Sequence, residues 1–258
     1  MSQSRAWSEA AAQYDDLFID PYAPDADNPL PTLLARIPGA SGRSVADLGC
    51  GTGPLLPLLA RTFREVHAID FAPGMLKLAR ERVAGLTNVT FHTSNLTRLS
   101  DLGLKVDVAV AVNSLVLPEL SALDETLRAI RASLNSGGRF YAVLPAMDGI
   151  QYHTMLLLDH FRAQGLSEAE ARLRTAEAAE HELFDFAWSG FRYRNLDQHF
   201  WQPHEIDYRL KLAGFGRVRK RKLRLSWSQM ALGSHLSRHP APWDWLVLAR
   251  REGLEAAP

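Results

Sequence analysis

Three glycines at alternate positions, Gly49, Gly51 and Gly53, separate two apolar runs in the segment SVADLGCGTGPLLPLL. Without a Cβ, glycine lets the backbone turn sharply and approach a bound molecule closely. Asp47 adds a carboxylate two residues before the first glycine. A glycine turn between a first strand and a first helix serves two classes of cofactor, nicotinamide dinucleotides and S-adenosylmethionine. The spacing of the glycines distinguishes the two classes.

A nicotinamide site uses the pattern G-x-G-x-x-G, whose third glycine allows close packing of helix on strand. Here Pro54 occupies the position of that third glycine. The segment DLGCGTG instead resembles motif I of the class I S-adenosylmethionine-dependent methyltransferases. The resemblance covers Arg43–Leu144 closely and Pro203–Arg250 more loosely. It implies that this chain uses S-adenosylmethionine as its cofactor.

The resemblance assigns roles to the motif residues. The glycines bring the backbone against the methionyl part of the cofactor, and the helix that follows offers N–H donors to the cofactor's carboxylate. The residues expected at this part of the cofactor are Asp47, Gly49, Cys50, Gly51 and Gly53. A carboxylate at the end of the second expected strand, Asp70, can accept hydrogen bonds from both ribose hydroxyls. The alternative role for Asp70 is a helix cap.

Further contacts follow from the same resemblance. Phe71 is expected to lie against the adenine and Met75 to cover its other face, although Met75 alone is also a common core residue. In HTSNLTRL, Asn95 is expected to bond the adenine amino group, where the family often has aspartate, and Leu96 to supply a backbone N–H. Tyr14 in AAQYDDL resembles a Tyr-Asp element that closes over the cofactor.

The fourth expected strand ends in Asn113 and Ser114, in a segment resembling the one that lines the methyl-transfer cleft. Ligands of open α/β sheets bind at this carboxyl edge of the sheet. The alternative is a polar strand exit that satisfies its own backbone.

The acceptor side of the site is less defined. Methyl transfer depends mainly on alignment and desolvation, and a histidine base helps only when the acceptor is a hydroxyl. His153 follows the fifth strand most closely and is the candidate base, with a surface or core-edge role as the alternative. The aromatic run FAWSGFRYRNLDQHFWQP is expected either to line an acceptor pocket or to pin an insertion to the sheet. Its candidate substrate contacts are Trp188, Arg192, Tyr193 and His199.

Alternating strand and helix signals predict an α/β fold: a seven-stranded, mostly parallel sheet with helices on both faces, its last strand antiparallel. The expected strands are Ser44–Leu48, Val66–Asp70, Val89–Thr93, Val106–Val112, Gly138–Leu144, Val218–Ser226 and Trp243–Arg250. The expected helices are Gly53–Arg61, Pro73–Val83, Ala122–Leu134 and a helix in PHEIDYRLKLAGFG. We expect a helical insertion, followed by an aromatic-rich loop, after strand five.

The whole chain, 1–258, is interpreted as one domain. It divides into an N-terminal cap (1–42), a cofactor-binding core (43–145), a lid insertion (146–202) and a C-terminal helix with a strand pair (203–258).

Composition narrows the class of protein. A formal net charge of zero gives no general attraction to nucleic acid or to an anionic membrane. The single cysteine excludes an internal disulfide and fits a reducing compartment. The N-terminus lacks a signal-peptide pattern and no apolar run suits a membrane span, so a cytoplasmic protein is expected, as a monomer or homodimer. The carboxylate sets of metal-dependent methyltransferases are missing, and no metal is expected.

Three hypotheses remain. The chain is a methyltransferase of a small molecule, a cofactor-binding partner without transfer activity, or a nucleic-acid methyltransferase that uses the basic stripe RVRKRKLR, 217–224. The stripe also fits an exposed strand that protects a sheet edge, so the small-molecule acceptor is preferred.

Overall fold

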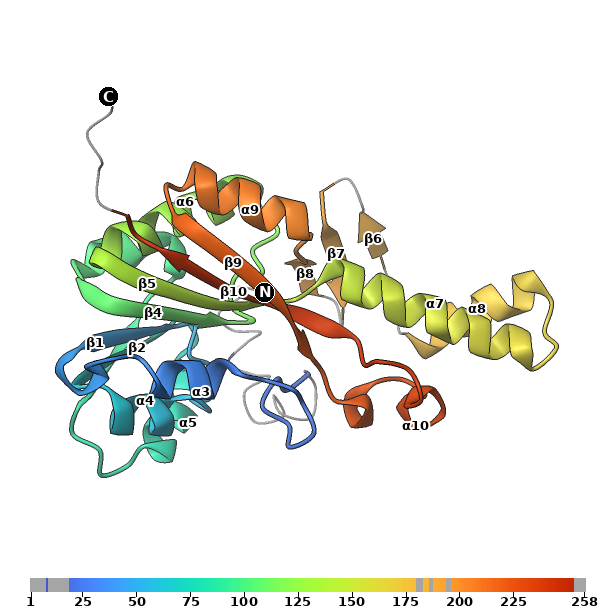
Figure 1. Cartoon of the computed structure of the whole chain (residues 1–258), viewed down its shortest axis with the longest axis horizontal. Coiled ribbons are helices and arrows are strands. Elements are labelled where there is room, and N and C mark those ends of the chain that lie inside the picture. Colours follow the sequence, from blue (N-terminus) through green and yellow to red (C-terminus); the bar gives the residue numbers. More distant parts are fainter. Residues whose placement is uncertain (1–7, 9–18, 180–182, 186–187, 194–195, 253–258) are drawn as a thin grey trace.

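The central element is a twisted sheet whose strands follow the order β3-β2-β1-β4-β5-β10-β9 (Figure 1). A computed structural model describes residues 8, 19–179, 183–185, 188–193 and 196–252. The strands are β1 (Ser44–Leu48), β2 (Glu65–Asp70), β3 (Val89–Thr93), β4 (Val106–Val112), β5 (Leu134–Leu144), β9 (Gly216–Arg224) and β10 (Trp243–Arg250). β1 to β5 run parallel, while β10 is antiparallel to both β5 and β9. The predicted fold class is confirmed.

Two layers of helices cover the sheet, one on each face (Figure 1). The helices α3 (Leu30–Ala35), α4 (Leu56–Thr62) and α5 (Pro73–Arg82) pack on one face, and α6 (Leu120–Ser133) and α9 (Pro203–Leu212) pack on the other. The short 3-10 helices η2 (Ala40–Gly42), η3 (Leu96–Leu102) and η4 (Trp227–Gln229) and the short α10 (Gly233–Leu236) lie in connections. β1 is buried at every position, as a central parallel strand should be.

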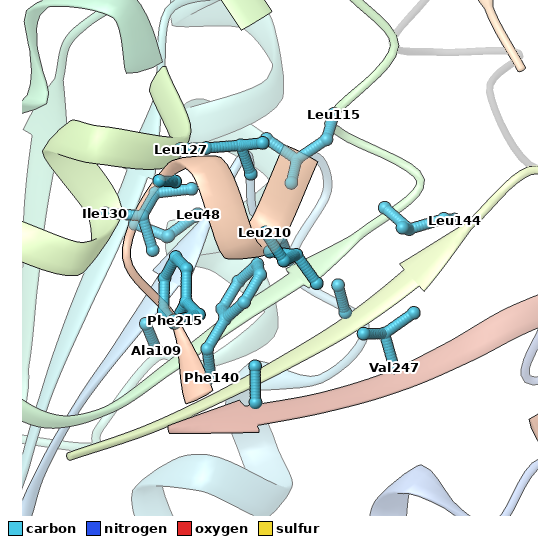
Figure 2. Close-up of a cluster of buried hydrophobic side chains, with 14 of the residues drawn as sticks. Leu48, Ala109, Leu115, Leu127, Ile130, Phe140, Leu144, Leu210, Phe215 and Val247 are labelled. Atoms are coloured by element: carbon cyan, nitrogen blue, oxygen red, sulfur yellow. The ribbon is translucent and has the colours of Figure 1, made fainter. Parts of the chain in front are cut away.

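The core between the sheet and α6 with α9 is closely packed (Figure 2). Phe140 of β5 stacks on Phe215, which follows α9, with ring centroids 5.4 Å apart. Leu127 and Ile130 of α6 and Leu210 of α9 complete this cluster (Figure 2). This packing fixes the strands whose carboxyl ends carry the candidate site.

The insertion after β5 contains more than helices. It begins with α7 (Met147–Ala163) and α8 (Glu168–Ala178), then forms a separate sheet of β6 (Leu183–Asp185), β7 (Gly190–Tyr193) and β8 (Leu196–His199). Its two ends are bonded together, since Met147 N donates to Trp201 O and Trp201 N donates to Pro145 O. The prediction of a loop for the aromatic run FAWSGFRYRNLDQHFWQP was therefore wrong at β7 and β8, because short strands with a weak local signal pair with one another.

Several predicted boundaries also differ, two of them by three residues or more. β5 begins at Leu134 instead of Gly138, because the NSGG segment enters the strand through an irregular pairing with β4. α4 begins at Leu56 instead of Gly53, since the glycine loop extends three residues further. None of the helices in the described part of the chain is both long and apolar enough to cross a bilayer.

Candidate active site

The glycine loop between β1 and α4 needs each of its three glycines for a different reason. All three have left-handed backbone angles, with φ of +71° at Gly49, +54° at Gly51 and +77° at Gly53. A Cβ on Gly49 would collide with Ser114, and one on Gly53 would lie 2.8 Å from Leu56 Cδ1. A Cβ on Gly51 would meet nothing within 4 Å. Gly51 therefore leaves open space beside the backbone, in the position expected for a bound molecule.

Asp70 ties this loop to the start of α5. Its Oδ2 accepts from Gly51 N and its Oδ1 accepts from Ala72 N, both at 2.9 Å. The side chain is buried, and burial raises its pKa above the ordinary value despite these bonds. The capping role and the ligand role are compatible, because a carboxylate offers about four lone-pair sites and the backbone N–H groups of Ala72, Gly51 and Phe71 occupy three of them.

A cleft opens above the carboxyl ends of β1, β2 and β4, with about 910 Å³ of empty space that includes its mouth. A cleft of this size suits a small-molecule site. Its walls comprise Gly49, Gly51, Asp70, Phe71, Met75, Asn95, Leu96, Val112, Asn113, Ser114, Val116, Leu117, Pro118, Asp197 and Gln198. Nine of the cofactor contacts proposed from the sequence thus share one cavity: Gly49, Gly51, Asp70, Phe71, Met75, Asn95, Leu96, Asn113 and Ser114.

A second cavity lies along the glycine loop and shares Gly49, Gly51 and Asn113 with the cleft. Asp47, Cys50 and Thr52 line it, and residues 19–22 of the N-terminal segment close it. Thr52 Oγ1 is buried without a hydrogen-bond partner among the described residues. Burial, and then the charge of Asp70, raise the pKa of Asp47 to about 7. The loop therefore has polar groups available on this side as well.

Gly53 and Tyr14 are placed differently from these residues. Gly53 packs against Ala79 of α5 and lines neither cavity, so its role in the structure is helix packing. Tyr14 lies outside the described residues.

Asn95 presents its amide in a specific orientation. Its Oδ1 accepts from Thr97 N at 3.0 Å and from Thr97 Oγ1 at 3.1 Å, which caps η3. Both lone pairs of this oxygen are therefore engaged. The Nδ2 donor remains for a ligand, and it suits a ring nitrogen of adenine instead of the amino group expected from the sequence.

Asn113 ends β4 with a left-handed backbone, φ +50°, and its side chain donates to Asp244 of β10. Its Oδ1 is buried without a partner in the described structure. Asp244 also accepts from Ala146 N at 3.3 Å, at the start of α7. Burial raises the pKa of Asp244 to about 7. Asp244 thus joins the wall of the cleft to the beginning of the insertion.

The small sheet of the insertion contributes two residues to the cleft, both from β8. Gln198 is 8% exposed, and its Nε2 has no hydrogen-bond partner among the described residues. Asp197 beside it receives two hydrogen bonds from Arg192, at 2.7 and 3.1 Å, and this contact lowers the pKa of Asp197. An unpaired buried amide costs free energy, so Gln198 is a strong candidate for contact with a ligand.

The structure does not bring the proposed acceptor residues of the insertion into the cleft. His153 on α7 contacts Ala231 O through Nε2 at 3.1 Å and packs edge-on against Trp227. Trp188 is 66% exposed. His199 is buried and contacts Glu205 at 3.1 Å, because alternation along β8 turns it away from Gln198. The Tyr193 side chain lies outside what the structure describes. Arg192 does not line the cleft, but it binds Asp197, which does.

Four polar contributors were not found from the sequence: Thr52, Asp197, Gln198 and Asp244. Asp197 and Gln198 belong to a polar strand that reads locally as a loop, and Asp244 lies in the apolar run PWDWLVLA. The sequence offered one signal for Asp244, namely that a carboxylate is unusual within an apolar strand.

Comparison with known proteins relates part of this chain to methyltransferases. A model of the methyltransferase domain matches residues 45–138, which contain the glycine loop, Asp70 and Asn113. Trans-aconitate 2-methyltransferase of Methylobacterium nodulans is 29% identical over 168 residues, 64% of this chain and 61% of that protein. Residues 45–138 therefore resemble the methyltransferase domain that this family model describes. Malonyl-[acyl-carrier protein] O-methyltransferase of Bacillus cereus is 29% identical over 196 residues, 75% of this chain and 65% of that protein.

These alignments span less than two thirds of the length of either curated relative. Among solved structures, the N-methyltransferase NodS of Bradyrhizobium japonicum WM9, in complex with S-adenosyl-L-homocysteine, superposes with a TM-score of 0.58. The match covers 96% of this chain and 97% of NodS at 14% identity. The chain therefore shares the fold of NodS over nearly its whole length.

Proposed function

We propose that the chain is an S-adenosylmethionine-dependent methyltransferase of a small molecule. The observation that carries the proposal is the open space at Gly51, where a Cβ would meet no protein atom although the surrounding loop is closely packed. Asp70 and the unpartnered Asn113 Oδ1 border the same space. The S-adenosyl-L-homocysteine bound to NodS, which is the demethylated form of this cofactor, supports the same choice.

The described residues fit the proposed cofactor along its length. Asp70 would accept the ribose hydroxyls, Phe71 and Met75 would enclose the adenine, and Asn95 Nδ2 would address a ring nitrogen. Asp47 and Thr52 would face the methionyl end, where an ammonium and a carboxylate need polar partners. When bound, S-adenosylmethionine supplies a sulfonium methyl group that a nucleophile displaces in line. The protein's contribution is to align the acceptor and to exclude water.

The proposed acceptor is a small molecule that presents a carbonyl or carboxylate oxygen to Gln198 Nε2. The insertion brings this buried donor to the wall of the cleft, which also includes the apolar side chains of Val116 and Leu117. The names of two relatives support the class, since trans-aconitate and a malonyl group both carry carboxylates. We accordingly propose that 146–202 is an acceptor-binding lid within a single domain, and that the protein works in the cytoplasm, which its single buried cysteine supports.

The test is transfer of labelled methyl from S-adenosylmethionine to a panel of trans-aconitate, malonyl pantetheine, a catechol, a primary amine and total RNA. Turnover of a carboxylate, with formation of S-adenosylhomocysteine, is the expected result. Turnover of RNA alone would contradict the small-molecule acceptor. A different result would favour a regulatory cofactor-binding protein. In that case S-adenosylhomocysteine would bind tightly, but no compound of the panel and no component of a cell extract would be methylated.

A further inference from the structure

Four arginines line a groove near the amino ends of the parallel strands. The cofactor cleft lies at the other ends of these strands, their carboxyl ends. We call this the arginine groove and define it by Arg139 of β5, Arg250 of β10, and Arg217 and Arg219 of β9. These residues come from three separate parts of the sequence. Adjacent pairing of β5 with β10 and of β10 with β9 brings them together.

The arrangement places like charges in direct opposition. Arg139 and Arg250 are cross-strand partners, and the next rung carries Tyr141, Leu248 and Arg219. Like charges opposite each other destabilise a sheet. Within the described residues, Arg139, Arg219 and Arg250 have no hydrogen bond or ion pair to offset this repulsion. The chain as a whole has a net charge of zero, so the concentration of charge is local.

Protection of the sheet edge explains only part of this pattern. β9 is the edge strand, and its arginines and lysines discourage pairing with another chain. Two of its other cations have partners, since Lys220 pairs with Asp207 and Lys222 lies over the Trp243 ring. Arg139 and Arg250 belong to inner strands, where no edge needs protection. Their presence requires another reason.

A carboxylate of the chain already uses one end of the groove. Glu252 lies over Gly216, where a side chain would collide with it, and its Oε1 is 3.3 Å from Arg217 Nε. A single carboxylate balances one of the four guanidinium groups. The Cα atoms of the other three arginines lie within about 12 Å of each other, because neighbouring strands are about 4.8 Å apart and a strand rises about 3.3 Å per residue. A compact group with several negative charges fits this spacing.

We propose that the arginine groove binds an oligophosphate, either inorganic or as the phosphate chain of a nucleotide. Guanidinium groups bind phosphate oxygens in pairs and remain charged at every physiological pH. The compact cluster favours an oligophosphate over a nucleic-acid backbone, which would need a longer track of free cations. This site is separate from the cofactor cleft and does not depend on the proposed reaction.

The test is calorimetric titration of the full chain with inorganic triphosphate and with ATP, in phosphate-free buffer at 150 mM salt. One site per chain with a dissociation constant below about 1 mM is expected. Arg139→Gln and Arg250→Gln should each weaken binding about tenfold or more, the scale of hydrogen bonds to charged groups. Equal affinity for both ligands would identify the phosphate chain as the recognised group, and tighter ATP binding would add the nucleoside.

The matched control is Arg174→Gln on α8, which removes the same charge from an exposed ion pair with Glu177. It should leave triphosphate binding unchanged. Thermal unfolding checks the fold, and Arg250→Gln should not lower the Tm because it removes a repulsion with Arg139. Absence of binding to the wild-type chain, or equal binding by the groove variants and the wild type, would overturn the proposal. Arginine-dependent binding of single-stranded RNA without binding of triphosphate would overturn it as well.

Discussion

Asp70 Oδ2 accepts a hydrogen bond from Gly51 N at 2.9 Å, and this bond joins the two strongest sequence signals in the chain. The carboxylate that ends β2 holds the glycine loop that follows β1. Both therefore face one cleft with fixed geometry before any ligand arrives, which reduces the ordering cost of binding.

Substitution of Gly51 should separate ligand binding from folding. Gly51→Val adds a branched side chain in the open space, so S-adenosylhomocysteine binding should be lost to calorimetry. The left-handed φ adds a strain of about 1–2 kcal/mol, and the chain should still fold. Gly49→Val is the matched control, because its side chain would collide with Ser114 and should lower the Tm much further. Unchanged affinity in Gly51→Val would mean that the ligand lies elsewhere.

Asp70→Ala should weaken S-adenosylhomocysteine binding by about 1.5–3 kcal/mol, the scale for hydrogen bonds to a charged group. It should also lower the Tm, because the N–H groups of Gly51 and Ala72 lose their acceptor. Asp70→Asn keeps one acceptor oxygen. Its affinity for S-adenosylhomocysteine and its Tm should therefore lie between those of the wild type and those of Asp70→Ala. An affinity equal to wild type in Asp70→Ala would remove Asp70 from the proposed cofactor site.

Binding should be linked to a proton on Asp47. Its pKa of about 7 in the free protein should fall when the cofactor's ammonium group comes near. At pH 6, binding of S-adenosylhomocysteine should therefore release a proton, and affinity should rise with pH until about 7. Calorimetry in two buffers of different ionisation enthalpy measures this release, which Asp47→Asn should abolish.

The same shift has a consequence for folding. A raised carboxyl pKa favours the protonated folded state, so the ligand-free chain should lose stability as pH rises from about 4 to about 7. The Tm of Asp47→Asn should depend less on pH over this range. If the Tm of Asp47→Asn depended on pH as the wild-type Tm does, the loss of stability would come from other groups. Asp244 is one such group, because burial raises its pKa in the same way.

Gln198, and not Trp188, should control acceptor turnover. Gln198→Ala removes the unpaired donor above the cleft and should reduce methyl transfer about tenfold while S-adenosylhomocysteine binds as before. Trp188→Ala should have no effect on either measurement, because this side chain is largely exposed. Loss of transfer in Trp188→Ala with full activity in Gln198→Ala would place the acceptor on another side of the insertion.

Most of the sheet was predictable because its central strands, such as β1 and β4, are short, apolar and buried on both faces. β1, β3, β4 and β10 begin and end at the predicted residues. The glycine loop was also predictable, since glycine spacing is local. Gln198 and Asp244 were not, because their positions depend on pairing between distant segments: β8 joins β7, and β10 inserts between β5 and β9. The alternation that turns His199 away from Gln198 follows from that same pairing.

The most direct test of the account is calorimetric titration of the full chain with S-adenosylhomocysteine and, separately, with NAD. The account predicts one S-adenosylhomocysteine bound per chain and no heat of binding for NAD, since Pro54 stands where dinucleotide sites have their third glycine. Binding of NAD without binding of S-adenosylhomocysteine would contradict it.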